Sequence, residues 1–403
     1  MRGNREGGAM KIVLVSPYDW RMPGGVNRHI DQLANQLIDR EHTVRILAPS
    51  SEPVDDQRVI VAGRPVAVSA SGSRARIALD PLLGRHVRSI LEQEQFDIVH
   101  VHEPLMPMLP IHVLRHSRRA NPSAVTIGTF HARKDGGSRL YAYGRPLLKR
   151  WFRAIDGKIA VSPPAAQYVG QYFPGFYNII PNGIDPERWA DPTIEPLPEF
   201  DDGRVNVLYV GRAEKRKGLP YLIRAFRMLH ARMPNTRLIV VGPDSRRLRR
   251  YQASIGREVR PSIVFVNGVS NADLPRYHRS AQIFCSPATG HESQGYVLLE
   301  AMAAGLPVVA SNIEGYASVL THEVEGLLVP PQDSLALADA LTTLARDAGA
   351  RARIGMAGRI RAEGYSWSRV TQQLLSYYER LRDARALALG AADRERDPVL
   401  WHE

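Results

Sequence analysis

The chain has 403 residues, of which 44% are apolar and 23% charged, and its mean hydropathy of -0.25 is ordinary for a globular protein long enough to form two or three domains. The single cysteine, Cys285, excludes an internal disulfide framework, and no apolar run approaches the roughly 18 residues of a membrane-spanning helix. The net charge is +12, and residues 58–153 alone carry 16 Lys and Arg against 6 Asp and Glu, so this stretch would attract a polyanion such as nucleic acid, anionic lipid or a phosphorylated small molecule.

Short β-branched strands alternate with helical patterns along the whole chain. The start of the chain has no apolar core and is therefore not a secretory signal, so we expect residues 1–9 to be a disordered leader before Met10. A helix is predicted at 26–40, where the apolar residues share one face. Strands are predicted at 11–17, 43–49, 96–102, 124–130, 157–162, 177–183, 205–211, 236–242, 262–268, 282–287, 306–311 and 326–330.

This alternation predicts an α/β protein with two doubly wound, Rossmann-like domains, because apolar strands joined by helices form parallel sheets covered on both faces. The proline-rich, acidic segment 186–203 shows no periodicity and is predicted to be a linker. It separates an N-terminal domain, 10–185, from a C-terminal domain, 204–365, while the helix at 366–389 lies outside the alternation and can pack back on the first domain. Ligands of such sheets sit beyond the carboxyl ends of the strands, so we expect the domains to face each other across a ligand-binding cleft.

The glycine pair Gly24 and Gly25 follows the first predicted strand and opens the first helix. Backbone N–H groups at a helix start bind anions, and two glycines let an anion approach the main chain closely. A tight strand–helix turn explains the pair equally well. The spacing is neither G-x-G-x-x-G nor a P-loop, so a dinucleotide dehydrogenase and a kinase lose their main sequence support.

A basic loop, GRAEKRKG at 211–218, ends the first strand of the second domain. Arg212 and Lys217 flank this loop, and two fixed cations there could neutralise a diphosphate and stabilise it as a leaving group. The alternative is a solvated basic loop.

Two glutamates eight positions apart stand in GHESQGYVLLEAMAAG at 290–305. A helix should begin near Gln294–Gly295, which puts Glu292 in the preceding loop, Glu300 in the apolar helix and an anion-binding cradle of N–H groups around 293–296. Burying an unpaired carboxylate is costly, so Glu300 either pairs with a buried arginine or accepts hydrogen bonds from sugar hydroxyls.

His131 closes the strand 124–130 at the expected ligand edge, although a lone histidine is more often structural than catalytic. His100 and His102 share one strand face, but no third ligand follows at a metal-binding spacing. The chain also has no D-x-D triplet to hold a divalent cation on a nucleotide diphosphate. We therefore predict no metal site and no cofactor.

Taken together, these stretches resemble the GT-B-fold glycosyltransferases of family 4 over nearly all of residues 10–385. The matching segments are PGGV, GTFHA, IPNGID, GRAEKRKG and HESQGYVLLEAMAAGLPVVAS, the last of which carries the E-x7-E pattern of Glu292 and Glu300. Within that family the chain looks most like the phosphatidylinositol mannosyltransferases, through SPYDWRMPGGVNRHIDQLANQL, ATGHESQGYVLLEAMAAGLPVVAS and VLTHEVEGLLVP.

The resemblance implies a retaining hexosyltransferase without an enzymatic nucleophile, in which catalysis is mostly positioning and electrostatic stabilisation. In such an enzyme Arg212 and Lys217 hold the donor diphosphate and Glu300 binds the ribose. The remaining residues that the resemblance assigns are Gly24 and Gly25 at the diphosphate, and Glu292, Gln294, Gly295 and His131 at the transferred sugar.

Two features leave the substrates open. Position 294 is Gln where this subfamily usually carries Phe beside the sugar, so the hexose is uncertain. The segment 69–80 differs from the acceptor loop usual in the subfamily, so recognition of inositol is uncertain too. Tyr18 and Lys134 are assigned to the acceptor by position alone.

A basic and apolar segment lies in the charged region. As a helix, residues 77–93 would have an apolar side bordered by arginines, which could lie in an anionic membrane interface at ~1 kcal/mol for each basic side chain. The alternative is a helix that faces the core and carries solvated arginines. The regional charge and the resemblance favour membrane contact, with the enzyme in the cytoplasm at the inner face of the plasma membrane. The predicted membrane patch consists of Arg74, Arg76, Arg85 and Arg88.

The leading interpretation is transfer of a mannosyl group from GDP-mannose to a membrane lipid such as phosphatidyl-myo-inositol. An alternative keeps the fold but uses a UDP-sugar, glucosyl or N-acetylglucosaminyl, with diacylglycerol or a soluble or polysaccharide acceptor. A third interpretation, a nucleic-acid-binding protein, lacks an aromatic platform and does not explain Glu292 and Glu300. The expected partners are thus a nucleotide-sugar and an anionic lipid but not nucleic acid, and the oligomeric state is left open.

Overall fold

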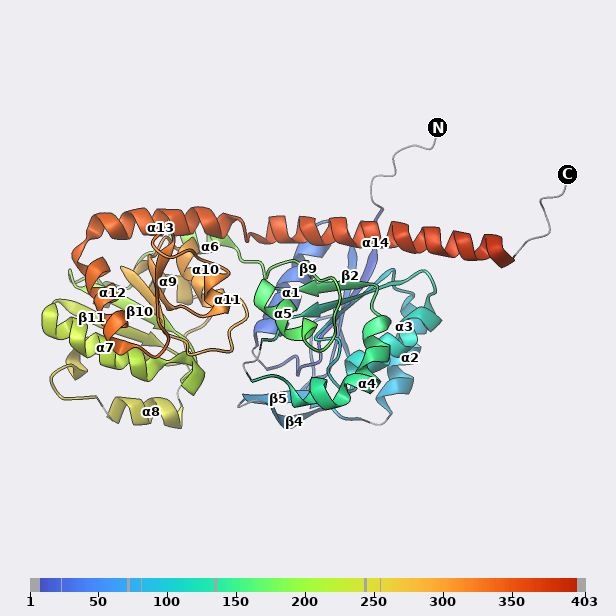
Figure 1. The fold of residues 1–403 in the computed structure, drawn as a ribbon, viewed down its shortest axis with the longest axis horizontal. Coiled ribbons are helices and arrows are strands. Elements are labelled where there is room, and N and C mark those ends of the chain that lie inside the picture. The colour runs from blue at the N-terminus through green and yellow to red at the C-terminus, as the bar shows by residue number, and fades with distance from the viewer. Residues whose placement is uncertain are drawn as a thin grey trace, which may run out of the picture. The chain divides into compact units, whose positions relative to one another are not determined.

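The computed structural model describes residues 8–22, 24–70, 73–80, 82–133, 136–242, 245–253 and 255–396. The chain divides into two compact units (Figure 1). Unit 1 takes the described residues up to Ala132, those of 137–181, and those from Trp367 on, whereas unit 2 takes the described residues of 133–136 and 182–366. The chain therefore leaves unit 1, forms unit 2 and returns to complete unit 1.

Unit 1 is built on a parallel sheet that, in the described residues, has seven strands in the order β3-β2-β1-β6-β7-β8-β9. The strands are β1 (Lys11–Val15), β2 (Thr43–Ala48), β3 (Val59–Val61), β6 (Ile98–His102), β7 (Val125–Phe130), β8 (Gly157–Ala160) and β9 (Asn178–Ile179). A separate antiparallel hairpin consists of β4 (Pro65–Ala70) and β5 (Ser73–Ala78).

Successive side chains of each strand enter opposite cores of unit 1, as the period of two requires. In β1, Ile12 and Leu14 pack with the helices of one face, and Val13 and Val15 with those of the other. The first face is covered by α1 (Gly25–Ile38) and α14 (Trp367–Arg396), and the second by α2 (Leu83–Glu94), α3 (Leu109–Ala120), α4 (Arg139–Arg153) and α5 (Pro163–Gly170).

Unit 2 repeats this plan on a parallel sheet ordered β12-β11-β10-β13-β14-β15 in the described residues. The strands are β10 (Val205–Val210), β11 (Thr236–Val241), β12 (Ile263–Val266), β13 (Ile283–Ser286), β14 (Val308–Ser311) and β15 (Gly326–Val329). One core lies under α7 (Leu219–Arg232), α8 (Arg246–Ala253) and α12 (Ser334–Arg346), and the other under α6 (Pro186–Ala190), α9 (Leu274–Arg279), α10 (Tyr296–Ala303) and α11 (Glu314–Ala317). Helix α13 (Ala348–Glu363) contributes to both, and the 3₁₀ turns are η1 (Pro198–Phe200), η2 (Lys215–Lys217) and η3 (Arg260–Ser262).

The predicted fold class, two doubly wound α/β units, is confirmed by these two parallel sheets. Each predicted strand is present, although most are shorter and the last strand of unit 1 is reduced to Asn178–Ile179. Within the described part of the chain, no helix combines the length and apolarity needed to cross a bilayer.

The segment 186–203, predicted to be a linker, is part of unit 2. Trp189 and Phe200 are buried in its core, and α6 and η1 form around them. The sequence did not predict this packing, because the segment is rich in proline and acidic residues. The two buried aromatic residues are also too far apart to make a periodic pattern. The chain passes from unit 1 to unit 2 at Pro181 and back at Trp367.

The helix predicted at 366–389 is α14, and it packs within unit 1. Its buried side chains recur at a helical spacing and join the core that α1 also covers. They are Trp367, Val370, Leu374 and Tyr378.

Candidate functional site

In unit 2, an acid and two cations meet where neighbouring strands end. β10 and β13 are adjacent and parallel, so their carboxyl ends lie at the same edge of the sheet. The loop after β13 carries Glu292, whose Oε1 lies 2.8 Å from Nζ of Lys217 and 2.5 Å from Nη1 of Arg216 in the loop after β10. The structure thus brings the predicted residues Glu292 and Lys217 together, with Arg216 as a third member.

Glu214 extends this cluster to the surface. Its carboxylate lies 2.8 Å from Nε of Arg216 and 3.0 Å from Nη1 of Arg212. Burial opposes the charge of Arg216, but Glu292 and Glu214 outweigh it and raise the pKa of the guanidinium. The side chain of Arg212 is 60% exposed and that of Lys217 only 15%, so Arg212 is the member open to an incoming anion.

A close backbone contact brings the two loops together. Gly218 has a φ of 72°, and a Cβ there would lie 1.7 Å from the carbonyl oxygen of Pro287. The N–H of Thr289 donates to the carbonyl of Arg216 at 2.7 Å across the same junction. Only glycine allows this approach, and the approach carries Lys217 to Glu292.

The helix that follows Glu292 begins at Tyr296, with Gly295 as its N-cap at a φ of 85°. Gln294, which the resemblance placed at the sugar, is 2% exposed and its Oε1 accepts hydrogen bonds from the N–H and the side-chain amide of Asn182, at 2.9 and 2.7 Å. Its amide therefore holds the PNG segment in place. Glu300 lies 2% exposed on α10, as the apolar run predicted.

In unit 1, the glycine pair opens α1, with Gly24 as the N-cap. A Cβ on Gly25 would meet no atom within 4 Å, so the space beside this helix start is open. Asn27, which was not among the predicted residues, fixes the preceding loop: its Oδ1 accepts from Oγ of Ser16 at 2.7 Å, and its amide donates to the carbonyl of Asp19 at 2.8 Å.

His131 follows β7 directly and is held by Glu103. The backbone N–H groups of His131 and Ala132 both donate to Oε1 of Glu103 at 2.8 Å. Glu103 is 3% exposed, and burial raises its pKa to about 7, although the two N–H donors act in the opposite direction. The ring nitrogen Nε2 of His131 lies 2.8 Å from Nδ1 of His102.

Ring nitrogens of His29, His102 and His131 lie within 4.8 Å of one another. Among the residues that the structure describes, these three histidines form a group that could hold a metal ion. This grouping was not predictable from the spacing within one strand, because His29 lies on another element. Two observations do not fit a metal: His102 and His131 bind each other directly, and Nε2 of His102 has no hydrogen-bond partner among the described residues. A ligating histidine ordinarily donates its other N–H to a fixed acceptor. The arrangement favours a hydrogen-bonded pair, and the absence of a cofactor stays a prediction.

His100 lies on β6, the strand that carries His102, and its ring has a structural role. Its ring nitrogens lie 2.6 Å from the hydroxyls of Tyr378 and Thr129. Burial lowers the pKa of His100 to about 3 and that of His102 well below its ordinary value, so both rings are neutral at neutral pH.

Of the two residues assigned to the acceptor, the structure describes only Tyr18. Tyr18 is half-buried, and its backbone pairs with Ile77 of β5. Burial, followed by the charge of Glu103, raises the pKa of its hydroxyl well above the ordinary value. Lys134 lies outside the described residues.

The predicted membrane patch needs correction. Helix α2 begins at Leu83, because Ile77 and Ala78 belong to β5. Of the predicted apolar side, Leu83, Val87, Ile90 and Leu91 are buried in the core of unit 1 and are not available to a membrane, whereas Leu79 and Leu82, which precede the helix, are 45% and 66% exposed. The core-facing alternative describes α2 correctly, since helical periodicity shows where apolar residues gather but not whether they are covered.

The four arginines of that patch lie on two elements, β5 and α2. Arg85 and Arg88 are exposed on α2, where Arg88 pairs with Glu92 at 2.7 Å. Arg74 lies in β5, but its side chain is outside the description. Arg76 is only 38% exposed, and its Nε lies 3.2 Å from the buried carboxylate of Asp19 without hydrogen-bond alignment.

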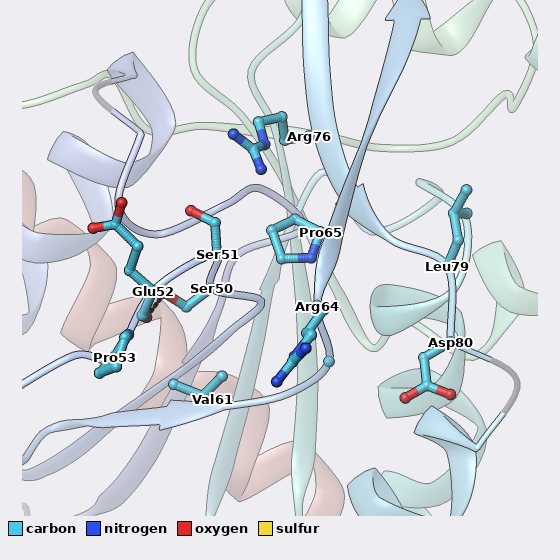
Figure 2. Close-up of a pocket in the computed structure, with 11 residues that line it drawn as sticks. Ser50, Ser51, Glu52, Pro53, Val61, Arg64, Pro65, Arg76, Leu79 and Asp80 are labelled. Atoms are coloured by element: carbon cyan, nitrogen blue, oxygen red, sulfur yellow. Dashed lines mark hydrogen bonds between the residues drawn. The ribbon is translucent and has the colours of Figure 1, made fainter.

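Arg76 instead lines a pocket of about 980 Å³ in unit 1 (Figure 2). The loop after β2 forms one side, and the hairpin with the residues after it forms the other. Its charged and polar lining is mixed in sign and consists of Arg64, Arg76, Glu52, Asp80, Ser50 and Ser51. The pocket offers two guanidinium groups to an anion, with hydroxyl and carboxylate groups around them.

Comparison with known families gives two matches. Residues 23–188 match the model described as Glycosyltransferase Family 4, and residues 192–361 match the model described as Glycosyl transferases group 1. The chain is 35% identical over 374 residues to the phosphatidyl-myo-inositol mannosyltransferase of Mycobacterium leprae (strain TN), covering 92% of this chain and 96% of that protein. It is 26% identical over 385 residues to a GDP-mannose-dependent alpha-(1-6)-phosphatidylinositol monomannoside mannosyltransferase of Mycolicibacterium smegmatis, covering 90% and 96%.

Solved structures show the same fold. A glycosyltransferase from Rickettsia africae ESF-5 has a TM-score of 0.76 at 19% identity and covers 93% of this chain and 99% of that one. HepE from Anabaena, in complex with UDP, has a TM-score of 0.72 at 19% identity and covers 92% and 100%. The resemblance found in the sequence is therefore confirmed, and the chain is a hexosyltransferase that belongs to the GT-B-fold family 4 glycosyltransferases, in the family of the phosphatidyl-myo-inositol mannosyltransferases.

Proposed function

We propose that this hexosyltransferase moves a mannosyl group from GDP-mannose, with retention of anomeric configuration, to a membrane lipid of the phosphatidyl-myo-inositol type. The names of the relatives support the mannosyl group and the lipid. The observation that carries the donor half of the proposal is the cluster of Arg212, Arg216 and Lys217 around Glu292 at the strand ends of unit 2.

The donor diphosphate would bind at the cationic side of this cluster. Arg212, the exposed member, approaches a phosphate first, and Lys217 supplies a second positive charge fixed by Glu292. As the bond between the anomeric carbon and the phosphate oxygen breaks, the leaving oxygen gains charge, which fixed cations stabilise without reorganisation. Glu292 keeps acceptor lone pairs for sugar hydroxyls, and Glu300 is proposed to bind the ribose.

The transfer itself needs no enzymatic nucleophile. The acceptor hydroxyl oxygen forms the new bond to the anomeric carbon, the leaving phosphate takes the bonding electron pair, and the hydroxyl proton passes to a phosphate oxygen. The protein contributes position and charge, which account for most of the catalysis in such reactions. His131, held by Glu103 and His102, and the open helix start at Gly24 and Gly25 are proposed to contact the donor from unit 1.

The pocket of unit 1 suits the headgroup of the acceptor. A phosphatidylinositol headgroup combines one phosphate with several hydroxyls. Either Arg76 or Arg64, which lie apart in the pocket, can bind the phosphate, and Ser51, Glu52 and Asp80 can bind the hydroxyls (Figure 2). Tyr18 lies beside β5, the strand that carries Arg76. We place the reaction at the inner face of the plasma membrane, where a water-soluble donor and a lipid acceptor meet.

A donor and acceptor panel tests the proposal. GDP-mannose, UDP-glucose and UDP-N-acetylglucosamine are each offered with phosphatidylinositol and with diacylglycerol, and the product masses are measured. A hexose added to phosphatidylinositol from GDP-mannose alone is the expected result. Product from a UDP-sugar, or on diacylglycerol only, would overturn the choice of substrates.

Two arginine variants distinguish a role in donor binding from a role in the stability of unit 2. Arg212→Ala should lower kcat/KM for the donor by about a hundredfold, in the range of lost transition-state contacts. Arg232→Ala is the matched control, because Arg232 also pairs with one acid in unit 2 but does so between α7 and α12, and it should leave the rate unchanged. Equal rates in the two variants would remove the cation cluster from the mechanism.

A further inference from the structure

Helix α4 has two apolar sides, and only one of them is covered. Tyr141, Leu148 and Phe152 face the core of unit 1, where they are 5–7% exposed. A second apolar row recurs three and four residues apart along the helix. It consists of Leu140, Tyr143 and Leu147, which are 43%, 84% and 71% exposed.

The rest of α4 is strongly basic. The helix contains five Lys and Arg and no acidic residue, and each basic side chain is exposed. At 3.6 residues per turn, Arg139 and Arg150 border the exposed apolar row, and the others continue around the outer side. These others are Arg145, Lys149 and Arg153.

The neighbouring segment adds another exposed apolar group at the C-terminal half of the helix. Phe173 stacks on Phe152 with ring centroids 5.2 Å apart, so the loop after it lies against α4. Phe176, in that loop, is 83% exposed. By contrast, the apolar side of α2 is buried in the core.

We propose that α4 lies in the interface of an anionic bilayer, with Tyr143 and Leu147 among the acyl segments next to the headgroups and Arg139 and Arg150 at the headgroups. An exposed apolar row beside a basic row is the arrangement of helices that lie in the membrane plane. Arginine keeps its guanidinium in water while its stem covers apolar surface. Contact between two copies is disfavoured, because it would bring the basic rows of both helices together.

The sequence predicted a membrane contact on the segment 77–93, whereas this assignment rests on α4. The surface is argued from the side chains of α4, and only its use in acceptor delivery rests on the proposed function. A unit 1 docked through α4 would take its acceptor from the surface to which it is bound.

Vesicle flotation tests the surface without any turnover. The vesicles are phosphatidylcholine alone, or an equimolar mixture of phosphatidylcholine and phosphatidylinositol. We expect the protein to float with the mixed vesicles, and less so as salt increases. Tyr143→Ser combined with Leu147→Ser should weaken the binding by about a hundredfold, since two large apolar groups lose their burial. Arg139→Gln combined with Arg150→Gln should weaken it by about tenfold.

The matched control is Met356→Ser combined with Ile360→Ser. These two are also four residues apart on a helix, α13 of unit 2, and they are 59% and 68% exposed. The control should bind vesicles as the unsubstituted protein does, and circular dichroism and thermal melting should show that every variant is folded. Unchanged binding after the α4 apolar substitutions overturns the proposal. So does a dimer, seen by light scattering, that those substitutions abolish.

Turnover then separates this proposal from the proposed function. With phosphatidylinositol in vesicles, the α4 apolar variant should lose activity, and with a short-chain, water-soluble phosphatidylinositol it should keep it. If the unsubstituted protein makes no product from either acceptor, the proposed function fails while the vesicle binding stands. If the variant equals the unsubstituted protein on vesicles, the membrane role of α4 fails.

Discussion

Glu292 holds two cations of unit 2 at once, Lys217 at 2.8 Å and Arg216 at 2.5 Å. Substitution can separate this contact with the cations from the role proposed for Glu292, accepting hydrogen bonds from the sugar. Glu292→Gln removes the negative charge but keeps the shape. The freed cations should still bind a diphosphate, whereas the sugar loses a charged acceptor.

We expect Glu292→Gln to lower kcat by about a hundredfold, the range for one lost polar contact at the reacting centre, and to leave the affinity for GDP equal or higher. Initial rates and calorimetry with GDP measure the two effects. Asp339→Asn is the control, because Asp339 pairs with Arg232 on the surface of unit 2. Loss of GDP affinity equal to the loss of rate would show that Glu292 acts only as a scaffold for the cations.

Several residues of the candidate site could be predicted from the sequence and others could not. Glu292, Arg212 and Lys217 could be predicted because they follow predicted strands, and the carboxyl edge of a parallel sheet is a known place for ligands. Arg216 and Asn182 were missed, because their roles depend on partners 76 and 112 residues away in the chain. Such pairs become visible only when the loops are placed in space.

At the scale of elements, the junction between the loops after β10 and β13 depends on Gly218. A Cβ at this position would overlap the carbonyl oxygen of Pro287, and the φ of 72° disfavours any other residue. Gly218→Ala should therefore force the two loops apart, which would separate Lys217 from Glu292. We expect a loss of unit 2 stability well above 1 kcal/mol, where about 1 kcal/mol is the cost of the φ alone.

Gly203→Ala supplies the matched control. Gly203 has a φ of 79°, but a Cβ there would meet no atom within 4 Å. The Gly203→Ala variant should lose only the free energy of unfolding that the unfavourable φ costs, and it should keep its affinity for the donor. Thermal melting and GDP calorimetry compare the two variants, and equal melting temperatures would contradict a steric role for the junction.

Elements with strong periodicity could be predicted from the sequence. Which of their apolar faces are covered by other elements could not. The strands of both sheets and the helix at 26–40 are present near the predicted residues, because continuous apolar runs specify buried elements. The hairpin β4–β5 was missed, because its second strand overlaps the segment 69–80 assigned to an acceptor loop and the start of the helix predicted at 77–93. Helices α2 and α4 are both amphipathic, yet α2 buries its apolar side while α4 exposes a second one, which depends on the neighbours in the fold.

At the scale of the whole molecule, buried titratable groups make the stability depend on pH. Among the described residues, three neutral histidines are fully buried: burial lowers the pKa of His100 to about 3, that of His278 to about 4 and that of His102 well below its ordinary value. The unfolded chain protonates all three near its ordinary pKa of 6.5, so it binds more protons than the folded protein below that pH. Each group should then cost about 1.4 kcal/mol of stability per pH unit as the pH falls below 6.5.

Glu103 acts in the opposite direction. Burial raises its pKa to about 7, whereas the unfolded carboxyl titrates near 4.5. Between these values the folded protein binds more protons, so Glu103 gains about 1.4 kcal/mol of stability per pH unit as the pH falls, and that gain is lost as the pH rises through 7. Unit 1 thus holds two histidines that weaken it in acid and one carboxyl that partly compensates.

Glu103→Gln isolates this compensation. The amide introduced by this substitution would keep an oxygen for the two backbone donors but cannot titrate, so the melting temperature of the variant should fall more steeply than that of the unsubstituted protein from about pH 7 to about pH 5. Calorimetric scans at several pH values measure the slopes, and Glu92→Gln, which removes an exposed carboxylate from α2, is the control. Parallel slopes for Glu103→Gln and the unsubstituted protein would mean that Glu103 is ionised in the folded state.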